Sequence, residues 1–156
     1  MVTTSTEIRV SGTSLLAPIL IGGTIAGVFD ETCAFVAMGW QVPRVVAAGL
    51  LGTWAIKSAS AWVWVLGVVL HFVVAFGAAT VYCLASRRLP FLKEHFAVSG
   101  MFFGIAVFLT MYLVVMPLSA LHYMGPYSHR TLVQGILVHM LLIGLPIGVS
   151  LRWWGE

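Results

Sequence analysis

The sequence predicts an all-α membrane protein, a bundle of four transmembrane helices with one additional short half-helix. Three observations lead to this prediction. The 156 residues are 60% apolar and only 8% charged, whereas a soluble domain carries about 25% charged residues. The mean hydropathy of the chain is +1.03. Four apolar runs are also long enough to cross about 30 Å of hydrocarbon, because a helix rises about 1.5 Å per residue.

Short segments rich in polar and aromatic residues separate the four runs. We expect the spans at about 15–39, 62–85, 96–118 and 132–151. Because these spans use most of the chain, we predict a single transmembrane domain over residues 1–156. The first run is longer than a typical signal-peptide core and no small-residue cleavage pattern follows it, so we expect a permanent helix.

A shorter apolar segment lies between the first two spans. It extends from Pro43 to Lys57, and its apolar part of about 12 residues would reach only about 18 Å as a helix. This length is too short to cross a membrane, so we predict an interfacial or re-entrant half-helix over residues 43–57. Proline is typical of a first helical turn, which agrees with Pro43 at the start.

The distribution of positive charge favours one orientation. With an even number of spans, both ends of the chain lie on one side, together with Arg9, Arg87, Arg88, Lys93 and Arg152. The other side holds Arg44, Lys57 and Arg130. The positive-inside rule therefore predicts cytoplasmic termini. These charges lie near the ends of apolar runs, where they meet lipid headgroups, so we expect the bilayer as a partner and no nucleic acid.

Small residues and prolines predict how the helices pack. Glycines recur four residues apart on the first, third and fourth spans, as the pairs Gly23 and Gly27, Gly100 and Gly104, and Gly144 and Gly148. This spacing is typical of helices that approach closely in lipid. We expect kinks at Pro117 and Pro146, because each proline removes a backbone hydrogen bond.

Ionisable residues form one layer across the predicted bundle. Asp30, His71 and His139 all lie about 10 to 14 Å from the outer ends of their spans. On the third span, Thr110 and Tyr112 fall in the same layer. The helical period places each of the three ionisable groups on the face of its helix that carries glycine, so we expect them to point inward.

Glu31 directly follows Asp30 in the stretch "TIAGVFDETC". Successive helical residues diverge by about 100°, so Glu31 cannot share the direction of Asp30. We therefore expect Glu31 to meet a different neighbouring helix or the half-helix.

Three interpretations of this layer remain open, because ionisable residues at such depth are costly and are functional candidates. In the first, Asp30, Glu31 and the two histidines share protons and sense or relay them. In the second, the polar groups only join helices, and the chain is a structural or assembly subunit, as a homo-oligomer or within a larger membrane complex. In the third, His71 and His139 are the axial ligands of haem b in an electron carrier.

Other chemistry has little support in the sequence. No motif of a hydrolase, a nucleotide-binding protein or a metalloprotease is present, so we predict no enzymatic activity. Cys33 and Cys83 lie within apolar runs and lack the spacing of a metal site or a disulfide framework. We therefore predict no metal, and no cofactor apart from the haem alternative.

The sequence also resembles a known family. The runs "LHFVVAFGAATVYCLASRRLPF" and "SGMFFGIAVFLTMYLVVMPLSAL" are similar to small uncharacterised bacterial inner-membrane proteins related to the YagU-like family. The residues that match are His71, Tyr82, Pro90, Pro117 with Leu118, and His139. The resemblance implies a multi-pass protein of the bacterial inner membrane, of unknown biochemical activity, with a proposed contribution to acid tolerance.

Overall fold

The computed structural model describes residues 14–125 and 128–155, and all regular elements within these ranges are helices. Four helical segments are long and apolar enough to cross a membrane. They are α1 (Leu16–Met38), α4 (Ala61–Ser86), the third span Phe96–Leu118 and the fourth span His129–Trp154. The predicted all-α bundle with four spans is thereby confirmed, and the chain is a membrane protein.

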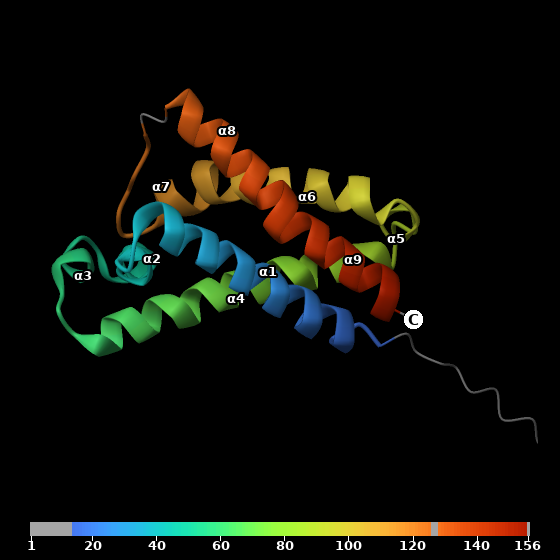
Figure 1. Ribbon diagram of the computed structural model, residues 1–156, viewed down its shortest axis with the longest axis horizontal. Coiled ribbons are helices and arrows are strands. Elements are labelled where there is room, and N and C mark those ends of the chain that lie inside the picture. The colour runs from blue at the N-terminus through green and yellow to red at the C-terminus, as the bar shows by residue number, and fades with distance from the viewer. Residues whose placement is uncertain (1–13, 126–127, 156) are drawn as a thin grey trace, which may run out of the picture.

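The spans form one bundle in which α1 lies against α4 and against the last part of the fourth span (Figure 1). The third span packs along the fourth. The start of α1, the short helix α5 (Phe91–Glu94) and the end of the fourth span lie at one end of the bundle, here called the α5 end. The opposite end carries α2 (Val42–Leu51) and α3 (Trp54–Lys57) and is called the α2 end.

The outer surface of the bundle is apolar. Large side chains such as Leu16, Phe102 and Leu113 are each more than 60% exposed. In water such a surface would be costly, whereas lipid tails are as apolar as these side chains. The exposed apolar surface therefore agrees with a lipid environment around the spans.

Glycines bring the third and fourth spans into backbone contact. A Cβ added at Gly144 would meet the carbonyl oxygen of Gly100, and a Cβ added at Gly100 would meet the carbonyl carbon of Gly144 at 3.2 Å. A Cβ added at Gly104 would likewise meet the carbonyl oxygen of His139. The predicted close approach through small residues is confirmed for this pair of spans, because only glycine fits at these positions.

The third and fourth spans change their helical register ahead of a proline. The third span consists of α6 (Phe96–Thr110), the π-helical turn η1 (Met111–Val115) and α7 (Met116–Leu118). The fourth consists of α8 (His129–Val138), the π-helical turn η2 (His139–Gly144) and α9 (Leu145–Trp154). Pro117 and Pro146 follow these turns closely. Since proline has no N–H and its ring clashes with the preceding turn, the wider π turn accommodates the missing bond.

The predicted half-helix is present as two helices rather than one. The chain breaks between α2 and α3 at Gly52, which has a φ of +82° that suits glycine. Pro43 packs against Gly67, six residues after the start of α4, so closely that a Cβ at Gly67 would meet the Pro43 carbonyl. Ala47 and Ala48 are fully buried. α2 therefore packs beside the helical part of α4 and not beyond its end. Whether the segment is interfacial or re-entrant stays a prediction.

Candidate functional site

A cavity of about 90 Å³ lies where α1, α2, α4, the third span and the fourth span meet. Asp30, His71 and His139 line it together. The rest of its wall is apolar or glycine, and includes Val46 of α2 and Val107 and Met111 of the third span. At about 30 Å³ per water molecule in the liquid, this volume corresponds to roughly three waters. The structure therefore brings the carboxyl group and both imidazoles of the predicted layer to one polar cavity.

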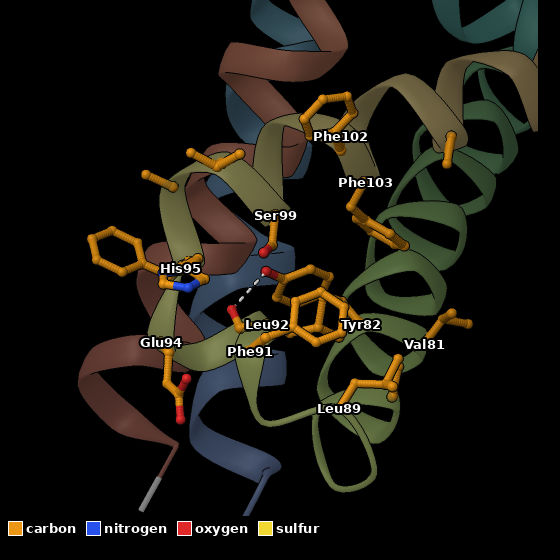
Figure 2. Close-up of a pocket in the computed structure, with 15 residues that line it drawn as sticks. Val81, Tyr82, Leu89, Phe91, Leu92, Glu94, His95, Ser99, Phe102 and Phe103 are labelled. Atoms are coloured by element: carbon orange, nitrogen blue, oxygen red, sulfur yellow. Dashed lines mark hydrogen bonds between the residues drawn. The ribbon is translucent and has the colours of Figure 1, made fainter.

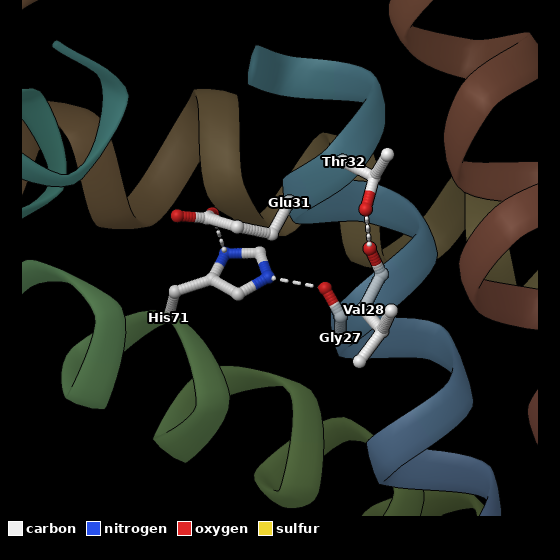
Figure 3. A network of polar contacts seen from close by, with 5 residues as sticks. All are labelled: Gly27, Val28, Glu31, Thr32 and His71. Carbon is white, nitrogen blue, oxygen red and sulfur yellow. Dashed lines mark hydrogen bonds and ion pairs between the residues drawn. The ribbon is translucent and has the colours of Figure 1, made fainter. Parts of the chain in front are cut away.

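His71 makes two contacts with α1, one through each ring nitrogen (Figure 3). Its Nε2 lies 3.0 Å from the carbonyl oxygen of Gly27. Its Nδ1 lies 3.3 Å from Oε2 of Glu31, one helical turn further along α1. The ring therefore joins α4 to α1 at two points.

These two contacts fix where protons can lie. A carbonyl oxygen can only accept, so Nε2 of His71 carries a hydrogen and donates it to Gly27. If Nδ1 and Glu31 both lacked a proton, a buried carboxylate would lie 3.3 Å from a neutral ring nitrogen, and nothing there would compensate its charge. One proton between them removes this penalty, either on the imidazole as an ion pair or on the carboxyl group as a neutral acid. His71 and Glu31 are thus close enough for one proton, held by either group, to balance the charge of the pair.

Glu31 is the most deeply buried acid of this group. The residue is 6% exposed, and neither carboxyl oxygen makes a hydrogen bond within the described part of the chain. The contact with His71 is therefore close in distance without the direction of a hydrogen bond. A buried carboxylate without hydrogen bonds is costly, so its contact with His71 is the main source of compensation. Asp30, by contrast, is half-buried and faces the cavity.

His139 presents one nitrogen to its own helix. Its Nδ1 lies 2.9 Å from the carbonyl oxygen of Gly135 and must donate to it, because that oxygen can only accept. In the neutral ring this leaves Nε2 as the basic nitrogen. The ring packs edge-on against Phe108, with 5.2 Å between the ring centroids. Asp30 and His71 both interact electrostatically with His139.

The structure does not bring the two predicted polar residues of the third span to the cavity. Thr110 is exposed, and its hydroxyl donates to the carbonyl of Ala106 in the same helix at 2.8 Å. Tyr112 is half-buried, with its ring 4.4 Å from that of Phe108. Val107 and Met111 occupy the cavity wall instead. Depth alone placed Thr110 and Tyr112 in the layer, but their direction around the helix keeps them out of it.

Sequence reasoning missed two participants in this site and did not single out the direct partner of His71. The carbonyl oxygens of Gly27 and Gly135 hold the two histidines, and Glu31, not Asp30, is the direct partner of His71. The spacing carries a signal for the acid, since Glu31 follows Gly27 by four residues and so lies on the same face of α1. The sequence carries no signal for the two carbonyl partners, because every residue has a backbone carbonyl.

The group does not have the geometry of a metal site. Within the described ranges, no cluster of three or more His, Cys, Asp and Glu side chains could hold a metal ion. Cys33 and Cys83 are free thiols. The chemistry that this arrangement supports directly is proton exchange between a carboxyl group and imidazoles.

Comparison of the chain with family models, with curated proteins and with solved structures gives no match. The class that the fold defines is a multi-pass α-helical membrane protein with a buried polar cavity.

Proposed function

We propose that this membrane protein senses or relays protons through the cluster formed by Glu31, His71, Asp30 and His139. The observation that carries the proposal is the position of His71, which donates to Gly27 through Nε2 and faces Glu31 through Nδ1. A pair that needs one proton between two acceptors changes its charge arrangement when a second proton arrives or the first one leaves. Such a change is the elementary event of a proton sensor or relay.

The cavity extends this pair toward further groups. His71 contacts Glu31 and also lines the cavity that holds Asp30 and His139. Water in a polar cavity of this size could connect the groups by hydrogen bonds. The cluster therefore offers two carboxyl groups and two imidazoles as successive proton positions across three spans.

The biological setting is part of the proposal. The resemblance to YagU-like proteins points to a role in acid or envelope stress at the bacterial inner membrane. Four cations of the predicted cytoplasmic side, Arg87, Arg88, Lys93 and Arg152, lie at the α5 end, whereas Arg9 lies outside the described residues. This distribution supports termini in the cytoplasm. Labelling of single cysteines introduced at Arg88 and at Lys57 by a membrane-impermeant reagent would test that orientation in intact cells.

The haem alternative receives less support from the geometry. Small-molecule sites usually have volumes of about 300 to 1,000 Å³, whereas this cavity has about 90 Å³. Axial ligation by His71 would also require one ring nitrogen to leave Gly27 or Glu31. Absorbance of the purified protein tests this alternative directly, because a bound haem gives a Soret band.

Proton flux in liposomes tests the main proposal. The purified protein is reconstituted with an internal pH-sensitive dye, and flux is measured after an acid jump for wild type, Asp30→Asn, Glu31→Gln and His71→Phe. We expect Glu31→Gln and His71→Phe to lose the flux and Asp30→Asn to reduce it. His129→Gln is the matched control, since His129 is exposed in the first turn of α8.

Survival of cells at low pH tests the other form of the proposal, in which the protein senses protons without conducting them. If all three cluster variants fold and match wild type in both flux and survival, the proposal is wrong. The structural interpretation would then stand, and pull-down in mild detergent would be the way to identify a homo-oligomer or a larger complex.

A further inference from the structure

A second, larger groove lies between α4 and α6 at the α5 end of the bundle (Figure 2). Its volume is about 990 Å³, at the upper end of the range of about 300 to 1,000 Å³ for ligand sites. Its walls are almost wholly apolar and include Val81 and Ala85 of α4 and Phe102, Phe103 and Ala106 of α6. The groove is open on the side that faces the lipid.

Internal contacts fix the shape of this groove. The buried Tyr82 forms part of its floor, and its hydroxyl donates to the carbonyl of Leu92 at 3.0 Å. The Tyr82 ring packs against Phe103 with 5.0 Å between the ring centroids. These contacts hold α5 and α6 against α4. Contacts within the chain therefore set the shape of the groove.

The end of the groove nearest α5 carries charge. Leu89 lines the groove, and the exposed Arg87 and Arg88 directly precede it. Lys93 donates to the carbonyl of Gly155, and Glu94 and His95 line the groove. The segment from residue 87 to residue 95, here called the basic rim, holds three cations and one acid, so its net charge is +2 when His95 is neutral. Of these four charged residues, only Glu94 lines the groove itself.

We propose that the groove binds an acyl chain of an anionic phospholipid, whose phosphate contacts Arg87 and Arg88. Apolar side chains line the groove, and the basic rim lies beyond its α5 end. A phospholipid has the same arrangement, because its apolar acyl chain is followed by a charged headgroup. Arginine forms strong paired hydrogen bonds with phosphate, and a basic segment at the membrane surface attracts anionic lipid.

Native mass spectrometry of the detergent-purified full chain tests the proposal. The probes are phosphatidylglycerol and phosphatidylcholine with identical acyl chains, added at equal concentration. We expect wild type to retain phosphatidylglycerol in preference to phosphatidylcholine. Arg87→Gln and Arg88→Gln should each weaken this retention roughly fivefold, as expected for a cation near an anionic headgroup. Arg130→Gln, at the start of α8, is the control and should retain the lipid as wild type does.

Variants that fill the groove test the contribution of its apolar walls to lipid binding separately from that of the basic rim. Ala85→Trp and Ala106→Trp each place an indole in the groove and should reduce the binding of both lipids. Ala37→Trp is the control, because Ala37 is exposed on α1 outside the groove. Helical content and elution volume in detergent show which variants are folded. At least one filling variant must fold for this comparison, and the rim variants test the headgroup contact independently.

Two outcomes would overturn the proposal. One is equal retention of the two lipids by wild type. The other is retention of phosphatidylglycerol by folded Ala85→Trp or Ala106→Trp at the level of Ala37→Trp. Cross-linking through a cysteine introduced at Phe102 provides an independent check, since efficient formation of a covalent dimer would show that a second copy occupies the groove instead of lipid.

Discussion

The imidazole of His71 lies between two acceptors of the same helix, 3.0 Å from the Gly27 carbonyl oxygen and 3.3 Å from Oε2 of Glu31. These acceptors differ, because the carbonyl has a fixed role while the carboxyl group can gain or lose a proton. His71 is therefore anchored to α1 on one side and lies beside an ionisable group on the other. A single ring thus connects the packing of α1 and α4 to the protonation of a buried acid.

Substitutions at Glu31 and His71 should not be additive. His71→Phe leaves the Glu31 carboxyl group buried without its partner, and Glu31→Gln removes the proton-sharing acid. We expect each to reduce the free energy of unfolding by about 1 to 3 kcal/mol, and the double variant to lose clearly less than the sum. Unfolding by SDS in mixed micelles, followed by circular dichroism, measures the three changes. Additive changes would show that the two side chains do not interact.

Glycine at position 67 should be required for the placement of α2. In Gly67→Ala the new methyl group meets the backbone carbonyl of Pro43, and neither main chain can yield locally. We expect a loss of about 1 to 3 kcal/mol in stability, measured by the same SDS titration. Gly77→Ala on the same helix is the control, because no heavy atom lies within 4 Å of a Cβ there. An equal effect of both substitutions would contradict the close packing of α2 on α4.

Pro146 should maintain the π-helical turn that begins at His139. Pro146→Ala restores an N–H and removes the ring that hinders an α-helical bond to the preceding turn. We expect η2 to relax toward α-helix, which would rotate His139 by about 100° if one residue of register is lost. NMR of the protein labelled with ¹⁵N-histidine should then show a large shift of the His139 ring signals. Pro117→Ala, which affects η1 instead, should shift them much less.

The hydroxyl of Tyr82 should stabilise the segment that carries α5. Tyr82→Phe removes the hydrogen bond to the Leu92 carbonyl, at a cost of about 1 kcal/mol. Because that bond joins α5 to α4, we expect faster cleavage by trypsin at Arg87, Arg88 and Lys93. Limited proteolysis in detergent measures the rate. The control is Thr80→Val, whose hydroxyl bonds only to Phe76 of its own helix, and unchanged cleavage in Tyr82→Phe would exclude this anchoring role.

The helices were predictable because apolar length and charge at the ends of a span are strong signals in a membrane protein. The four spans agree with the expected ranges to within a few residues. The fourth span begins at His129 of α8, three residues before the predicted start. Ser128 caps this helix, because its side chain accepts a hydrogen bond from the Thr131 amide at 3.1 Å. The break at Gly52 uses a positive φ that glycine permits, and a pattern of hydrophobicity does not show at which residue the chain turns.

The sequence predicted which residues form the candidate site better than it predicted the contacts between them. Depth and helical period were sufficient to group Asp30, His71 and His139, which line one cavity. They could not show that Glu31 lies closest to His71, since that depends on the angle at which α1 and α4 cross. The same limit applies to Thr110, which shares the depth of the cavity but lies on the outer surface of its span.

Because of Gly104, the two sides of the cavity are built by two different pairs of helices. The absence of a side chain there lets the main chain of α6 rest directly against the His139 carbonyl. The third and fourth spans are thus locked together at the level of His139, while Gly27, Glu31 and His71 belong to the paired helices α1 and α4. The gap between the two imidazoles is therefore set by how the pair of α1 and α4 packs against the pair of the third and fourth spans. Tension or thinning of the surrounding bilayer would act on that same gap.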